Sequence, residues 1–147
     1  MTKLQAIRTF VSVVLEDKIT IARNKLDHNW GMALNPELKH PRLYISNAPD
    51  ERDDADKFFR KDFIERCPLA QGFASITLTL LHECGHWATR SVFDIYTYEK
   101  QYEKIESMEQ YVKNPYEMLA TQWAICWLQD SINRKHAKAF EKAYFGY

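Results

Sequence analysis

The sequence has no apolar run long enough to cross a membrane and no excess of charge of either sign. Its 20 Lys and Arg residues balance 20 Asp and Glu residues, so the overall charge does not point to nucleic acid or to an anionic membrane as a partner. Internal repeats and low-complexity tracts are also missing. With 147 residues, of which 46% are hydrophobic and 14% aromatic, the chain is expected to form one compact domain over residues 1–147.

Cysteine is scarce, which argues against a disulfide framework. Cys67, Cys84 and Cys126 are odd in number and unrelated in spacing, so free thiols in a reducing compartment are expected. The first residues lead into an amphipathic segment that contains Arg8 and Glu16, which is unlike a signal peptide. These features predict a cytoplasmic location.

The motif that decides the interpretation is His82-Glu83-Cys84-Gly85-His86, at the end of an apolar segment compatible with a helix. Residues four apart share a helix face, so His82 and His86 can point two imidazoles at one metal ion. Glu83 then lies where it can act as general base toward water, which completes the parts of a zinc hydrolase. The alternative is a solvated helix end with two surface histidines. Cys84 points away from the histidine face and is interpreted as a small buried filler.

A catalytic zinc site needs a third protein ligand, and the best candidate is Glu117. The metzincin pattern is excluded because Thr89 and Val92 occupy its glycine and third-ligand positions. Glu117 lies in the first turn of a predicted apolar helix, where a buried carboxylate is costly unless it is paired or binds a metal. The alternative is a surface glutamate favoured by the helix dipole. Other acidic residues lie in the polar stretch between: Asp94, Glu99, Glu103, Glu106 and Glu109.

The remaining patterns predict a mostly helical α+β domain with a small antiparallel sheet beside the motif helix. Leu43-Tyr44-Ile45-Ser46 alternates apolar and polar side chains and is the best strand, with Leu43 and Ile45 facing the core. Asn114 and Pro115 are typical of a helix N-cap and first position. Helices are expected at about residues 4–26, 50–66, 73–89, 115–132 and 135–144, whereas residues 91–111 show no clear period.

The two helical motifs together resemble the gluzincin class of zinc peptidases. The segment from Thr79 to Thr89 is similar to the motif helix in the zincin-like C-terminal domain of ArdC-type antirestriction proteins, and residues 114–120 are similar to that family's later glutamate helix. The ImmA/IrrE-like peptidases share the layout more loosely. Cys84 and Gly85 stand where the family usually has Leu and Ala, which leaves the metal motif intact. The resemblance implies a zincin fold and a protein encoded by a phage or mobile element.

These observations predict a zinc-dependent peptidase in which His82, His86 and Glu117 hold the ion and Glu83 is the general base. A peptide or protein substrate is expected to pair with a strand at the sheet edge, through residues Leu43, Tyr44, Ile45 and Ser46. Tyr116 and Tyr96 are candidate oxyanion stabilisers, with Tyr98, Tyr102, Tyr111 and His136 also open. The alternative is a non-catalytic zincin-fold protein that binds DNA or a host protein in an antirestriction or regulatory role.

Overall fold

The computed structural model describes residues 1–24, 31–32, 38–46, 54–92, 103 and 105–147. Within these residues the chain is mostly helical with one small sheet, so the predicted α+β class is confirmed. The elements are α1 (Lys3–Leu15), β1 (Thr20–Asn24), β2 (Gly31–Met32), β3 (Arg42–Ser46), α2 (Asp54–Arg66), the 3-10 helix η1 (Pro68–Gly72), α3 (Ser75–Ala88), α5 (Met108–Lys113), α6 (Pro115–Leu128) and α7 (Ser131–Phe145).

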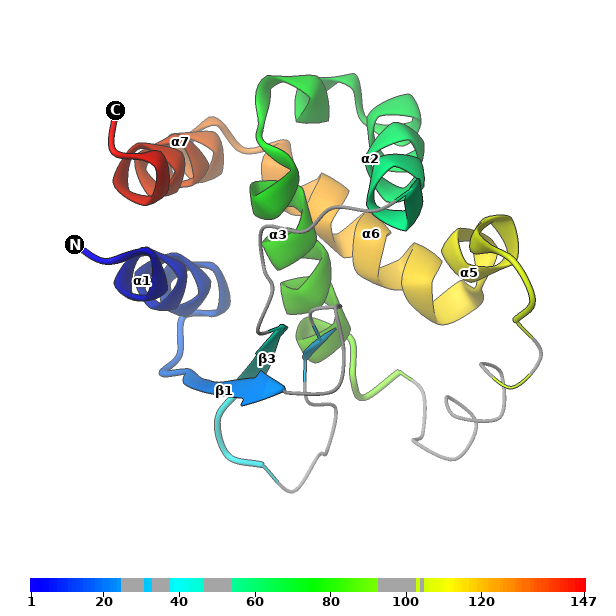
Figure 1. The fold of residues 1–147 in the computed structure, drawn as a ribbon, viewed down its shortest axis with the longest axis horizontal. Coiled ribbons are helices and arrows are strands. Elements are labelled where there is room, and N and C mark those ends of the chain that lie inside the picture. Colours follow the sequence, from blue (N-terminus) through cyan, green and yellow to red (C-terminus); the bar gives the residue numbers. More distant parts are fainter. Residues whose placement is uncertain (25–30, 33–37, 47–53, 93–102, 104) are drawn as a thin grey trace.

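Helix α3 occupies the centre of the molecule and α6 crosses it (Figure 1). Helices α1 and α7 lie side by side on one flank, with both chain ends, and α2 and α5 lie on the other. The sheet lies near the C-terminal end of α3. In the described part of the chain, none of the helices combines the length and the apolar character that a membrane crossing requires.

The first helix is shorter than the sequence pattern predicted. It begins with a capping box, in which the Thr2 side chain accepts a hydrogen bond from the Gln5 N–H, and it ends at Leu15 because Glu16 adopts a left-handed conformation with φ of 53°. The prediction of a helix through residue 26 was therefore wrong. Ile21 belongs to β1, whose pairing with β3 outweighs the approximate helical spacing.

The sheet is mixed, not antiparallel as expected. Its strand order is β1-β3-β2, with β1 parallel and β2 antiparallel to β3. The predicted strand is confirmed, and Leu43 and Ile45 are buried as expected. The predicted edge position is wrong, because β3 is the central strand of the described sheet. Leu43 pairs with Ile21 on one side and with Met32 on the other.

The motif helix α3 has an unusual N-terminus. Its N-cap residue Ala74 has no side chain that could cap the helix, so the cap comes from α7. Glu141, only 2% exposed, accepts hydrogen bonds from the Ala74 N–H (2.7 Å) and from the Thr77 hydroxyl (2.5 Å). A carboxylate at a helix N-terminus satisfies free N–H groups and interacts favourably with the helix dipole. This contact fixes α3 to the C-terminal helix.

For the later helices, the predicted start of α6 agrees with the structure, whereas the predicted boundary between α6 and α7 does not. The Asn114 side chain accepts from the Tyr116 N–H and Pro115 opens α6, as expected. Helix α6 ends at Leu128, and α7 begins after the Asp130 N-cap, earlier than predicted. Helix α5 was missed, because its six residues carry too little pattern to reveal a helical period.

Candidate metal centre

Helix α3 presents His82 and His86 on one face, as their spacing predicts. Both side chains are buried, and their ring centroids are 4.7 Å apart. The apolar residues of the same helix, including Leu78, Leu80 and Leu81, are fully enclosed. The histidines therefore lie at the edge of the core and not at a solvated helix end, which removes the alternative interpretation of the motif.

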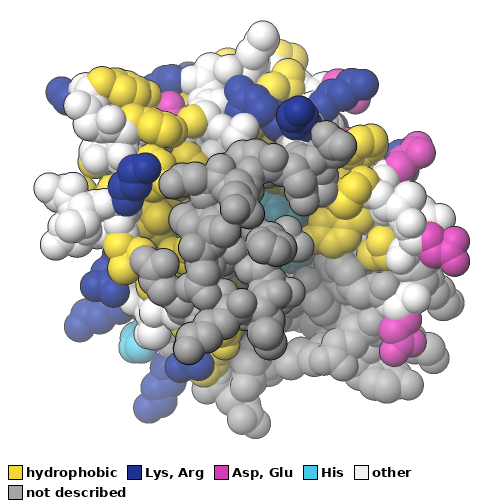
Figure 2. Space-filling view, in the orientation of Figure 1, with side chains coloured by type: hydrophobic (Ala, Val, Ile, Leu, Met, Phe, Trp, Pro, Cys, Tyr) yellow, Lys and Arg dark blue, Asp and Glu magenta, His cyan; other side chains and the backbone are white. Residues whose placement is uncertain are grey.

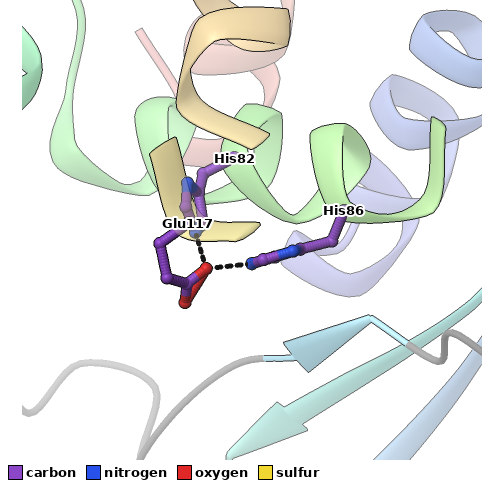
Figure 3. Close-up of side chains that lie close together, drawn as sticks. All are labelled: His82, His86 and Glu117. Atoms are coloured by element: carbon purple, nitrogen blue, oxygen red, sulfur yellow. Dashed lines mark ion pairs between the residues drawn. The ribbon is translucent and has the colours of Figure 1, made fainter. Parts of the chain in front are cut away.

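Glu117 reaches both histidines from the first turn of α6 (Figure 3). Its Oε2 lies 3.2 Å from His82 Nε2 and is also in contact with His86 Nε2. Glu117 is only 2% exposed, so it is not a surface glutamate placed by the helix dipole alone. The structure thus brings together the three residues that the sequence proposed as ligands.

The approach of the two helices depends on Gly85, between the histidines. A Cβ atom at this position would lie 2.2 Å from the backbone oxygen of Ala120 on α6. No side chain fits in that space, so the backbones of α3 and α6 touch there. Glu117 lies one turn before Ala120, and the close crossing brings its carboxylate to the histidine face of α3.

The arrangement fits a metal ion. One ligand atom from each of His82, His86 and Glu117 lies within 4.8 Å of the others. Glu117 Oε2 is buried, and the imidazole nitrogens of His82 and His86 both face it. A buried carboxylate beside two imidazoles needs a positive charge nearby, and a cation between the three atoms would supply it. Two imidazole nitrogens and one carboxylate are a donor set that suits divalent transition metals.

Burial and mutual attraction shift the pKa values of the three candidate ligands. Burial lowers the pKa of His82, which favours its neutral, metal-binding form. For His86, burial acts in the same direction, but the attraction and hydrogen bond to Glu117, together with attraction to Glu83, outweigh it and raise the pKa. Burial would raise the pKa of Glu117, but the two neighbouring imidazoles hold it well below its usual range. The Glu117 carboxylate is therefore ionised near neutral pH.

Glu83 is buried next to the ligands without being one of them. Burial raises the pKa of its carboxyl group to about 8, and a backbone hydrogen bond from Met32 opposes that shift. Met32 belongs to β2, which packs against α3. Figure 3 shows strands below the three labelled side chains. The strand that contacts Glu83 is thus β2, whereas Leu43–Ser46 of β3 were expected to form the sheet edge that borders the site.

Two further side chains hold the His82 ring, and sequence reasoning missed both. Thr121, on α6, places its Oγ1 2.9 Å from His82 Nδ1. Phe59, on α2, meets the His82 ring edge-on at 5.0 Å between centroids. The spacing of four residues between Glu117 and Thr121 was an available signal, because it puts both on one helix face. The Phe59 contact depends on how α2 packs and has no such signal.

The other candidates fall into three groups. Tyr116 is buried beside Glu117, and Tyr111 is partly buried. Glu103, Glu106 and Glu109 are exposed, and none belongs to the ligand cluster. His136, on α7, is exposed, and the remaining candidates lie outside the described residues: Asp94, Tyr96, Tyr98, Glu99 and Tyr102. In the space-filling view, a small area of histidine surface is visible near the centre of the face, beside hydrophobic side chains (Figure 2).

Cys84 is completely buried, as its position on the helix predicted. Burial raises the pKa of its thiol, so the sulfur stays protonated, and a protonated thiol is neither a good metal ligand nor a nucleophile. All three cysteines are free thiols. Cys84 therefore acts as core packing between the two histidines.

Comparison with known proteins adds no relative. No family model matches the chain, and no curated protein or solved structure is significantly similar to it. The similarity of the motif helices to gluzincin peptidases and to ArdC-type antirestriction proteins therefore stays a prediction from the sequence.

Proposed function

We propose that this protein is a zinc-dependent peptidase of the cytoplasm in which His82, His86 and Glu117 hold the ion and Glu83 is the general base. The observation that carries the proposal is that two imidazole nitrogens meet one buried Glu117 oxygen, with the three ligand atoms close enough together to share a single ion. Three ligands of this type leave one position open, which is typical of catalytic zinc and not of structural zinc.

The chemistry divides between the ion and the chain. Zinc, when bound, supplies Lewis acidity toward a carbonyl oxygen and lowers the pKa of water. Glu83 accepts the proton of the attacking water and delivers it to the leaving amine. Burial raises the pKa of the carboxyl group to about 8 in the absence of a cation, and a cation beside it would lower that pKa and favour the ionised form that a general base needs. A backbone hydrogen bond from Met32 helps to hold the Glu83 carboxylate.

A peptide substrate is best accommodated along β2. This strand is at the edge of the described sheet and lies against Glu83, whereas Leu43 and Tyr44 of β3 are already paired on both sides. An extended peptide can add to such an edge by backbone hydrogen bonds. Tyr116, which is buried and directly precedes Glu117 in α6, is the candidate oxyanion stabiliser proposed among the described residues.

The test compares Glu83→Gln with wild type. Protein purified without added metal should contain one zinc per chain in both forms, because Glu83 is not a ligand. Hydrolysis of unstructured peptides should fall by about 10²–10⁴-fold in the variant, the usual cost of losing a general base. The exposed Glu65→Gln on α2 is the matched control and should keep full activity.

Each outcome has a clear meaning. Equal activity in wild type and Glu83→Gln would exclude the proposed mechanism. Zinc without hydrolysis in wild type would favour a binding protein built on the same site.

A further inference from the structure

The His82 ring is held at both nitrogens by residues of a single helix. Its Nε2 lies 3.2 Å from Glu117 Oε2, and its Nδ1 lies 2.9 Å from Thr121 Oγ1. Glu117 and Thr121 are one turn apart on α6, so they form a pair that spans the imidazole. The Thr121 side chain is 3% exposed, and its hydroxyl faces His82 inside the protein.

We propose that Thr121 is a positioning residue for the metal centre, and this inference rests on the proposed zinc site. A neutral imidazole carries one proton, and the nitrogen without it is the one that binds metal. If the Thr121 hydroxyl accepts a hydrogen bond from Nδ1–H, the lone pair is on Nε2, the nitrogen that faces Glu117 and His86. Thr121 thereby selects both the tautomer and the orientation of the ring.

The position of Thr121 makes this role specific. Ala120, the preceding residue, is where the α6 backbone touches Gly85 of α3. The crossing that brings Glu117 to the histidines therefore also brings Thr121 to His82. Phe59 packs edge-on against the same ring and restricts its rotation from the α2 side. A hydroxyl adds no charge to the cluster, so the balance between one carboxylate and two imidazoles is left intact.

The experiment removes the hydroxyl while keeping the shape. Thr121→Val replaces it by a methyl group, and Thr121→Ser keeps it. Zinc affinity is measured by competition with a chromophoric chelator, and the His82 ring protons are followed by NMR in ¹⁵N-histidine-labelled, zinc-loaded protein. We expect Thr121→Val to weaken zinc binding by about 10–100-fold and to lose the slowly exchanging Nδ1–H signal, whereas Thr121→Ser retains both.

Thr77→Val is the matched control, because Thr77 is equally buried and its hydroxyl bonds to Glu141 away from the metal ligands. This control should lower stability without changing zinc affinity. If Thr121→Val does not fold, Thr121→Ala is compared with Thr121→Ser in the same way.

Wild-type affinity and an unchanged Nδ1–H signal in Thr121→Val would overturn the inference. Zinc binding without peptidase activity in wild type would overturn only the peptidase proposal, whereas a wild type that binds no zinc would overturn both.

Discussion

The α3–α6 crossing and the α1–α7 pair are both contacts between helices, but they are packed in opposite ways. Between α1 and α7, Phe10 stacks on Phe140 with centroids 4.7 Å apart, so large rings fill the space between the helices. Between α3 and α6, Gly85 and Ala120 leave no space for a side chain. The size of the residues at a contact sets the distance between the helices.

The two contacts therefore have different roles: the α1–α7 contact mainly stabilises the fold, whereas the α3–α6 contact also positions the candidate metal site. The aromatic pair buries a large apolar area, which is the main source of folding free energy. The glycine crossing holds two helices close enough for the side chains of His82, His86 and Glu117 to meet. The comparison predicts that substitutions in the α1–α7 pair mainly change stability, whereas substitutions at the α3–α6 crossing also change metal binding.

The largest loss of stability is expected for Phe10→Ala. Phe10 is 3% exposed and contacts Trp127 as well as Phe140, so its removal leaves a cavity in the core. The free energy of unfolding should fall by about 3–5 kcal/mol, measured by urea denaturation. Zinc affinity of the folded protein should not change. The exposed Phe145→Ala serves as control, and a parallel loss of zinc affinity in Phe10→Ala would contradict the separation.

Gly85→Ala tests the crossing itself. In an exposed helix, this change would stabilise the protein by about 1 kcal/mol. Here the new Cβ meets a backbone oxygen at 2.2 Å, and a backbone atom cannot rotate away. We expect a net destabilisation at the upper end of the about 1–3 kcal/mol typical of overpacking, together with loss of zinc binding as α3 and α6 separate.

Gly72→Ala is the matched control for this substitution, because nothing lies within 4 Å of a Cβ at that position. It should be neutral or slightly stabilising and should keep the metal. If Gly85→Ala bound zinc as tightly as wild type, the close crossing would not be what positions Glu117.

The smallest of these effects is expected for Glu141→Gln. Glu141 connects the α1–α7 pair to helix α3 of the crossing. The Glu141 carboxylate caps α3 from α7, and the amide oxygen of Gln can still accept hydrogen bonds but carries no charge. Hydrogen bonds to a charged group are stronger than bonds between neutral groups, so the free energy of unfolding should fall by about 1–2 kcal/mol. Zinc affinity should be nearly unchanged, which titration of the same samples would check. A large loss of zinc affinity would show that the cap at the start of α3 also affects the geometry of the metal site.

Local patterns were sufficient to predict the elements that carry the site. The spacing of His82 and His86 requires one helix face, and Asn114 with Pro115 marks the start of α6 in the structure as it did in the sequence. A glutamate in an otherwise apolar helix signalled a buried partner, and Glu117 has one. These predictions succeeded because each depends on residues within a few positions of one another.

Predictions that depended on distant residues failed or were not possible. The helix of residues 4–26 was wrong because a strand pairing with β3 claims residues 20–24. The edge position of β3 was wrong because β2 pairs with it on the side opposite β1. Strand β2 has only two residues, which is too short for a sequence pattern to reveal it. Helix α5 was missed for the same lack of length.

The sequence by itself determined the donor set and the helix faces on which the donors lie, because helical geometry fixes which residues point the same way. Only the tertiary structure decided that α3 and α6 cross at Gly85, that Thr121 meets His82 and that β2 contacts Glu83. The physical reason is that close packing between elements depends on the fit of all their side chains at once, which no local window of the sequence contains.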